Sequence, residues 1–311
     1  MTFSNMTKAI LLLSAGTASS FTVDDSIPKN VARQTIQTIQ TEHEEPQERQ
    51  SQKANKININ INSSVLTFPE EFNQKTYDTW SKLSPFVWSK RQQGLECELT
   101  WKKSAPTWIV VDNLLHKISP WFVNELANEE DKISLQEDIH HSIKKFQEVC
   151  GQSLSDIDSY KIKVSAKYGP TATQCPAWHA DTVPMRWIQA MFGPGCYYIH
   201  SDDTSNEYID KIFKGVAGAG VPYGRPGKWK EEMVKRSGVK LHQTVAGDPV
   251  ILIGRLWSNS KVAGLPELSP VLHRSPLNVP SKQGRVLLTL DVITTAMKEE
   301  DDECNERCCQ K

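Results

Sequence analysis

The chain has 311 residues, of which 38% are hydrophobic and 23% are charged, and its formal net charge at pH 7 is −1. A chain of this length forms one or two globular domains. Because the charges nearly balance, the sequence shows no basic footprint for nucleic acid, and we expect no DNA or RNA partner.

The amino terminus is typical of a signal peptide over residues 1–20. Lys8 precedes an apolar run at residues 9–13, and the small residues 18–20 stand directly before Phe21. The apolar run is too short to span a bilayer. We therefore expect entry into the secretory pathway and no membrane span once the signal is removed.

The residues around this cleavage site, Ala18 to Phe21, also resemble the motif of bipartite plastid-targeting presequences in algae with secondary plastids. This resemblance implies the plastid as the destination, and plain secretion is the alternative. Residues 21–64 are polar and contain the repetitive stretch 56–62, in which Asn alternates with Ile. Such low complexity predicts a disordered linker or a transit peptide.

A single domain is expected over residues 65–296. Within it, residues 121–149 carry apolar side chains at helical spacing, such as Ile139 and Phe146, and predict one or two amphipathic helices. Residues 162–168 then predict a strand. The remaining residues, 297–311, form an acidic tail that contains cysteine, and we expect them to be solvated.

The motif that carries most information follows this strand, at His179-Ala180-Asp181. On a strand, residues two apart point to the same side, so His179 and Asp181 can enter one cavity while Ala180 faces away. Taken alone the motif is weak, and a surface or capping histidine is the competing interpretation of His179.

Further apolar runs bounded by turns predict more strands, at residues 182–192, 197–199, 250–254 and 286–292. Residues 203–243, rich in glycine, predict an irregular insertion where substrate contacts or a lid would lie. A second histidine, His273, stands between the last two runs, and Arg285 opens the final one twelve residues later. A guanidinium group is suited to a bidentate grip on a carboxylate.

This order of turn, apolar strand, His, loop and Arg on a last strand predicts the back half of a double-stranded β-helix. The expected fold is therefore mainly β: a jelly-roll, cupin-like domain of mostly antiparallel strands, with helices from residues 120–150 packed outside. The two histidines and the aspartate match the facial triad that holds Fe(II) and leaves positions open for oxygen and substrate.

Two blocks of the sequence resemble the domain-of-unknown-function family numbered 1826. They are residues 175–195, from Cys175 through the Gly193-Pro194-Gly195 turn, and residues 272–291. The resemblance covers roughly residues 75–295 and implies no assigned activity. Bacterial members are often encoded near zinc-homeostasis genes, which implies metal handling.

The block from His273 to Arg285 also resembles the end of phytanoyl-CoA-type and other Fe(II)/2-oxoglutarate oxygenases. That resemblance implies that Arg285 binds the distal carboxylate of 2-oxoglutarate. Arg274 and Arg186 are further candidates for that role or for substrate binding.

The expected catalytic and metal-binding residues are thus His179, Asp181 and His273, with Fe(II) and 2-oxoglutarate as cofactors. The expected outcome is hydroxylation of a small-molecule or protein side-chain substrate.

Two alternatives stay open. Two histidines and one aspartate also suit zinc, which would make the protein a metal-binding protein of metal homeostasis without redox catalysis. In a structural cupin-like module, the same residues would only form hydrogen bonds in the core. Cys175, His200 and His242 are alternative ligands, with packing or surface hydrogen bonding as their competing roles.

Overall fold

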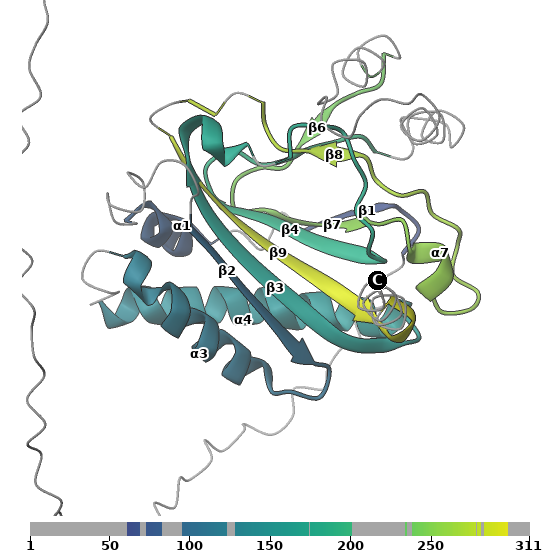
Figure 1. Ribbon diagram of the computed structural model, residues 1–311, viewed down its shortest axis with the longest axis horizontal. Coiled ribbons are helices and arrows are strands. Elements are labelled where there is room, and N and C mark those ends of the chain that lie inside the picture. The colour runs from purple at the N-terminus through teal and green to yellow at the C-terminus, as the bar shows by residue number, and fades with distance from the viewer. Residues whose placement is uncertain are drawn as a thin grey trace, which may run out of the picture. The chain divides into compact units, whose positions relative to one another are not determined.

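Figure 1 shows a computed structural model of the chain. It describes residues 61–68, 73–82, 95–122, 128–173, 175–200, 234, 238–277, 279–280 and 283–297. All of them belong to the compact unit Ile57–Lys311. The expected signal peptide, most of the linker, most of the 203–243 insertion and residues 298–311 of the tail lie outside the described residues.

The larger of two sheets has six antiparallel strands in the order β1-β7-β4-β9-β3-β2. Their bounds are β1 Val65–Thr67, β2 Leu95–Lys102, β3 Ile157–Tyr168, β4 Met185–Phe192, β7 Pro249–Ile253 and β9 Gly284–Thr294. Four of these strands lie where the apolar runs predict them. Strands β1 and β2 were not predicted from the sequence.

The smaller sheet has the order β6-β5-β8, with β5 at Tyr197–Tyr198, β6 at His242–Gln243 and β8 at His273–Arg274. An isolated antiparallel bridge between His179 and His273 extends it by one position. In Figure 1 the two sheets lie face to face.

The chain alternates between the two sheets from β3 onward. It passes from β3 to the His179 bridge, back to β4, then through β5 and β6 to β7, and finally through β8 to β9. This alternation is the double-stranded β-helix that the sequence predicts. The two sheets are not joined into a closed barrel.

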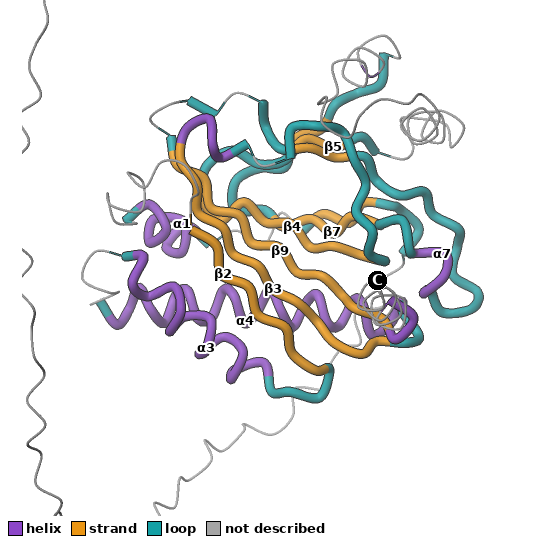
Figure 2. The backbone as a smooth tube through the Cα atoms, viewed as in Figure 1, coloured by secondary structure: helices purple, strands orange, loops and turns teal. Residues whose placement is uncertain are grey.

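Helices cover the outer face of the larger sheet, as Figure 2 shows in purple. They are α1 (Gln74–Ser81), α3 (Thr107–Ile118) and α4 (Glu129–Ser153). The 3-10 turn η2 (Ser119–Trp121) directly follows α3. The predicted helical region 121–149 is thus mainly α4, which begins at its N-cap Asn128 and has three acidic residues in its first turn, a favourable arrangement at a helix N-terminus.

The core lies between these helices and the sheet. Phe146 of α4 packs edge-on against Tyr160 of β3 and Trp187 of β4, with ring centroids 6.2 and 6.4 Å apart. On β9 the residues Val286, Leu288, Leu290 and Val292 are fully buried on this side. Since side chains alternate along a strand, the odd-numbered residues of β9 face the smaller sheet.

Two short elements complete the described chain, the 3-10 turn η4 (Gly169–Ala172) and helix α7 (Trp257–Ser260). Ile61 and Ser64, which precede the expected start of the domain at residue 65, are buried. Among the described residues, no helix is both long and apolar enough to cross a membrane.

Candidate metal centre

His179, Asp181 and His273 converge on the inner side of the smaller sheet. Reciprocal backbone hydrogen bonds join the two histidines: the His179 amide donates to the His273 carbonyl at 3.1 Å, and the His273 amide donates back at 2.8 Å. His179 Nε2 lies 3.7 Å from Asp181 Oδ1, and His273 Nε2 lies 3.2 Å from Asp181 Oδ2. The three ligand atoms lie within 4.8 Å of one another, so one ion can be shared among them.

Both imidazole rings are oriented by the backbone two residues earlier. His179 Nδ1 lies 2.9 Å from the Ala177 carbonyl oxygen, and His273 Nδ1 lies 3.2 Å from the Val271 carbonyl oxygen. A carbonyl only accepts, so Nδ1 carries the proton in each neutral ring and Nε2 keeps its lone pair. Both lone pairs are therefore on the nitrogen atoms nearest Asp181, as in metal-binding histidines.

The electrostatics favour the ligand forms of these side chains. Burial raises the pKa of Asp181, but the adjacent His273 imidazole and the positive charge of Arg186 outweigh it and hold the pKa well below its usual range. Burial, with the neighbouring His273, lowers the pKa of His179. Asp181 Oδ2 is buried and accepts no hydrogen bond of good geometry. An ionised carboxylate oxygen in this state, beside two imidazole lone pairs, fits a divalent cation.

Arg186 of β4 fixes the carboxylate of the triad. Its Nη1 lies 2.6 Å from Asp181 Oδ1. Its Nε and Nη2 donate to the two oxygens of Asp291 on β9, at 2.6 and 2.8 Å. Because Asp181 Oδ1 is occupied in this way, Oδ2 is the oxygen that remains for an ion.

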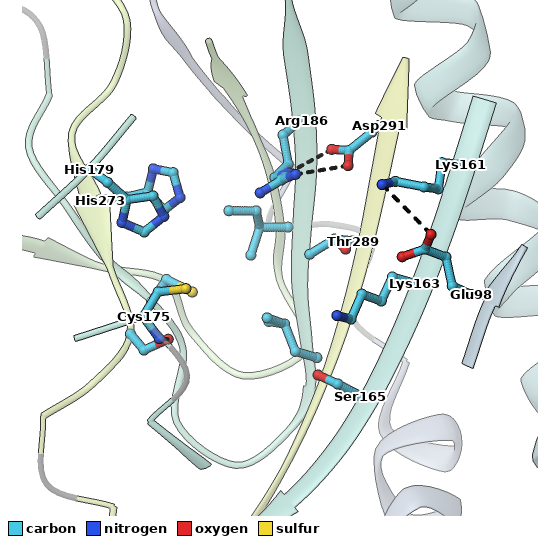
Figure 3. Close-up of a pocket in the computed structure, with 14 residues that line it drawn as sticks. Glu98, Lys161, Lys163, Ser165, Cys175, His179, Arg186, His273, Thr289 and Asp291 are labelled. Carbon is cyan, nitrogen blue, oxygen red and sulfur yellow. Dashed lines mark hydrogen bonds and ion pairs between the residues drawn. The ribbon is translucent and has the colours of Figure 1, made fainter. Parts of the chain in front are cut away.

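A cavity of about 240 Å³ lies between the triad and the larger sheet, as Figure 3 shows. The smaller-sheet side contributes Cys175, His179, Cys196, His273 and Ser275. The larger sheet contributes Glu98, Lys161, Lys163, Ser165, Arg186, Ile188, Leu287, Thr289 and Asp291. One wall of the cavity therefore carries the candidate metal ligands, and the other carries several charged side chains.

Arg285 and Arg274 do not line this cavity. Arg285 is buried on the cavity side of β9, but its guanidinium donates to the carbonyl oxygens of Pro194 and Ala172, at 2.8 and 3.3 Å, and contacts Cys196 Sγ at 3.1 Å. The Arg285 guanidinium thus contacts Cys196, which lines the cavity, but does not line the cavity itself. The Arg274 guanidinium stacks 5.0 and 4.9 Å from the ring centroids of Trp178 and Tyr197. Of the three arginines considered from the sequence, the cavity contains Arg186, which is bound to the carboxylates of Asp181 and Asp291.

The other candidate ligands lie elsewhere or beside the triad. Cys175 lines the cavity, but His200 hydrogen-bonds Ser63 at 3.2 Å and His242 stacks on Tyr198 at 5.2 Å. Within the described part of the chain, His179, Asp181 and His273 are the one group of this kind that can share an ion.

Asp291, Lys161 and Lys163 line the cavity although they were not predicted from the sequence as site residues. Asp291 carried a usable signal, because it lies six residues after Arg285 and therefore on the same face of a strand whose alternate residues are apolar. The lysines offered none, since alternating Lys is also common on solvated strands.

Comparison with known proteins gives one family. The model of the family described as "Protein of unknown function (DUF1826)" matches residues 112–291, which is more than half of the 311 residues. The match includes all three triad residues. No curated protein matches the chain.

Solved structures give distant likenesses. A dioxygenase for auxin oxidation from rice has 12% identity and a TM-score of 0.34, over 70% of this chain and 66% of that one. Full-length T7H of Neurospora crassa in complex with alpha-KG has 8% identity and a TM-score of 0.34, over 75% and 76%. A prolyl-4-hydroxylase from Pseudomonas putida has 9% identity and a TM-score of 0.29, over 75% and 94%.

Proposed function

We propose that this chain, which belongs to the DUF1826 family of proteins of unknown function, is a non-haem Fe(II)- and 2-oxoglutarate-dependent oxygenase. The observation that carries the proposal is the convergence of His179, Asp181 and His273 at the wall of a cavity. Two imidazole nitrogens and one carboxylate oxygen on one face are the ligand set of non-haem Fe(II) oxygenases. When bound there, Fe(II) supplies oxygen activation for the hydroxylation of a C–H bond.

The charge of the cavity supports a dianionic co-substrate. The described charged residues that line it, counted together with Asp181 of the triad, are three cations and three anions, namely Lys161, Lys163 and Arg186 against Glu98, Asp181 and Asp291. With neutral imidazoles, a bound divalent ion leaves the cavity with two net positive charges. A dianion such as 2-oxoglutarate neutralises them, which is electrostatically favourable.

The chain's own residues prepare the site for this chemistry. The carbonyls of Ala177 and Val271 hold both Nδ1 protons, so Nε2 of each ring faces the cavity without a tautomer change. Arg186 keeps Asp181 ionised and limits it to one free oxygen. A carboxylate that binds through one oxygen occupies one position and leaves more of the ion's positions open. The substrate in this proposal is a small molecule or a protein side chain.

A zinc-binding protein of metal homeostasis is the second candidate, and one observation favours it. Arg285, the arginine that the oxygenase resemblance implies as the 2-oxoglutarate anchor, is hydrogen-bonded outside the cavity. The same three ligands suit Zn(II) with water in a fourth position.

Metal and co-substrate titrations separate the two candidates. Protein prepared without oxygen is titrated with Fe(II) and with Zn(II), and each loaded form is then titrated with 2-oxoglutarate; Fe(II)-loaded protein is finally exposed to oxygen and assayed for succinate. The proposal expects one ion per chain, binding of 2-oxoglutarate and succinate formation. Zn(II) binding with no affinity for 2-oxoglutarate in either form would establish the zinc candidate instead. In Asp181→Ala, binding of either ion should be lost, whereas Asp158→Ala, which removes a surface partner of Lys102, should bind normally.

A further inference from the structure

The cavity wall opposite the triad carries Lys163. Lys163 lies on β3, on the same face as Ser165, and its register partner on β9 is Thr289. All three line the cavity. In Figure 3 the side chain of Lys163 extends into the cavity, which has His179 and His273 on its other side.

The surroundings of Lys163 leave positive charge on this wall. The Glu96 carboxylate forms ion pairs with two ammonium groups, that of Lys163 at 2.9 Å and that of Lys167 at 3.1 Å. Burial raises the pKa of Glu96, but the two lysines outweigh it, so the pKa lies below the ordinary value and the carboxylate is ionised at neutral pH. One negative charge therefore faces two positive charges, and the excess charge can attract an anion.

Each of the other two cations among the described residues that line the cavity has a carboxylate partner that it does not share with a second lysine. Arg186 is bound by two carboxylates. Lys161 faces a carboxylate of its own, Glu98, at 3.8 Å. Arg285 does not reach the cavity, because its guanidinium is bound to two backbone carbonyls and Cys196.

We propose that Lys163, with the Thr289 hydroxyl beside it, binds the remote carboxylate of a 2-oxo dicarboxylic acid whose oxo end lies at the triad. This inference rests on the proposed function, since it assumes a co-substrate that bridges the two walls. An ammonium group has three donors, so Lys163 can keep Glu96 and bind a second carboxylate. The site thereby replaces the arginine of the last strand by a lysine on the neighbouring strand, four positions away along the register.

The inference predicts selectivity by the length of the acid. 2-Oxoglutarate reaches both walls, whereas pyruvate has the same oxo acid end and no remote carboxylate. The experiment titrates each acid calorimetrically, without oxygen, into full-length protein loaded with Mn(II). Wild type should prefer 2-oxoglutarate by about 10- to 100-fold, as one charge-assisted hydrogen bond of this kind provides. Lys163→Met should lose that preference while pyruvate affinity stays the same, and Lys163→Arg should largely keep it.

Lys167→Met is the matched control, because it removes the other ion pair of Glu96 but Lys167 does not line the cavity. It should weaken 2-oxoglutarate binding much less than Lys163→Met does, because it lowers the positive charge near the wall but leaves Lys163 in place to bind the carboxylate. The inference is overturned if Lys163→Met keeps the preference, if Lys167→Met loses it equally, or if wild type binds the two acids alike. Mn(II) affinity, measured first for every variant, is expected to be unchanged. Normal Mn(II) binding separates failure of this anchor from failure of the metal centre.

Discussion

Asp291 shows how a residue outside the triad can control it. Its carboxylate grips the Nε and Nη2 of Arg186, whose Nη1 in turn holds Asp181. Arg186 thus has one position in which it satisfies both acids. The geometry of Asp181 therefore depends on a residue 110 positions later in the chain.

Asp291→Asn should weaken metal binding about 10- to 100-fold, the usual effect of removing the group that orients a ligand. The amide loses one acceptor and the negative charge, so Arg186 is no longer held in place and Asp181 gains rotational freedom. Isothermal titration with Mn(II) measures the change.

Asp131→Asn provides the control for Asp291→Asn, since Asp131 is also buried and ion-paired, to Lys82 at 2.7 Å, but lies at the helices rather than the cavity. It should lower the free energy of unfolding without altering metal affinity. Equal loss of affinity in both variants would mean that Asp291 acts only through stability.

At the level of elements, the loop that carries Asp181 is set by the close approach of two segments. The Arg255 amide donates to the Asp181 carbonyl at 2.9 Å, and the Gly254 amide donates to the Pro184 carbonyl at 2.9 Å. A Cβ on Gly254 would lie 2.0 Å from the Val183 carbonyl oxygen. Only glycine fits there without moving backbone, so the end of β7 helps to place a metal ligand.

Gly254→Ala should therefore destabilise the protein by about 1–3 kcal/mol and weaken metal binding, because the loop at residues 181–184 must shift to relieve the overlap. Gly151→Ala in α4 is the opposite case, with open space around the new methyl group. It should stabilise by up to about 1 kcal/mol, the helix preference of alanine over glycine. Urea unfolding of both variants measures the change in the free energy of unfolding, which should be a loss for Gly254→Ala and a gain for Gly151→Ala. Destabilisation by Gly151→Ala would contradict the described packing.

Much of this arrangement could be predicted from the sequence. The apolar runs that become β3, β4, β7 and β9 have clear periodicity and turns at their ends, and the two histidine motifs mark the smaller sheet. β2 alternates polar with apolar residues, which is also a strand signal, but its register with β3, which places Lys163 within 2.9 Å of Glu96, does not follow from either strand alone. Such pairs depend on register, which single-strand patterns do not specify.

The triad could be predicted from the sequence, whereas the direction of the Arg285 side chain could not. The i, i+2 spacing of His179 and Asp181 predicts that the two side chains point to the same side, and Arg186 then orients the Asp181 carboxylate. Arg285 also lies on the predicted face of β9, but the direction of its long side chain is decided by carbonyls of Pro194 and Ala172, which come from distant turns. Backbone position follows from sequence pattern more directly than the end of a flexible side chain does.

For the whole molecule, metal binding should raise the free energy of unfolding. The triad joins two segments of the smaller sheet, so an ion that binds only the folded chain shifts the unfolding equilibrium. At a free Mn(II) concentration 100 times the Kd, the stabilisation should be about 2.7 kcal/mol. Thermal unfolding with and without Mn(II) measures it, and Asp181→Ala should show no shift; an equal shift in that variant would place the ion elsewhere.

The reciprocal hydrogen bonds between His179 and His273 also determine when the site can form. These residues are 94 positions apart, and closing a loop of that length costs about 4 kcal/mol in chain entropy. An ion cannot lower this cost early, because its ligands meet only after the strands on both sides have paired. Metal should therefore leave the refolding rate unchanged and slow unfolding, so that the ion acts as a latch on a finished structure and not as a template for its assembly.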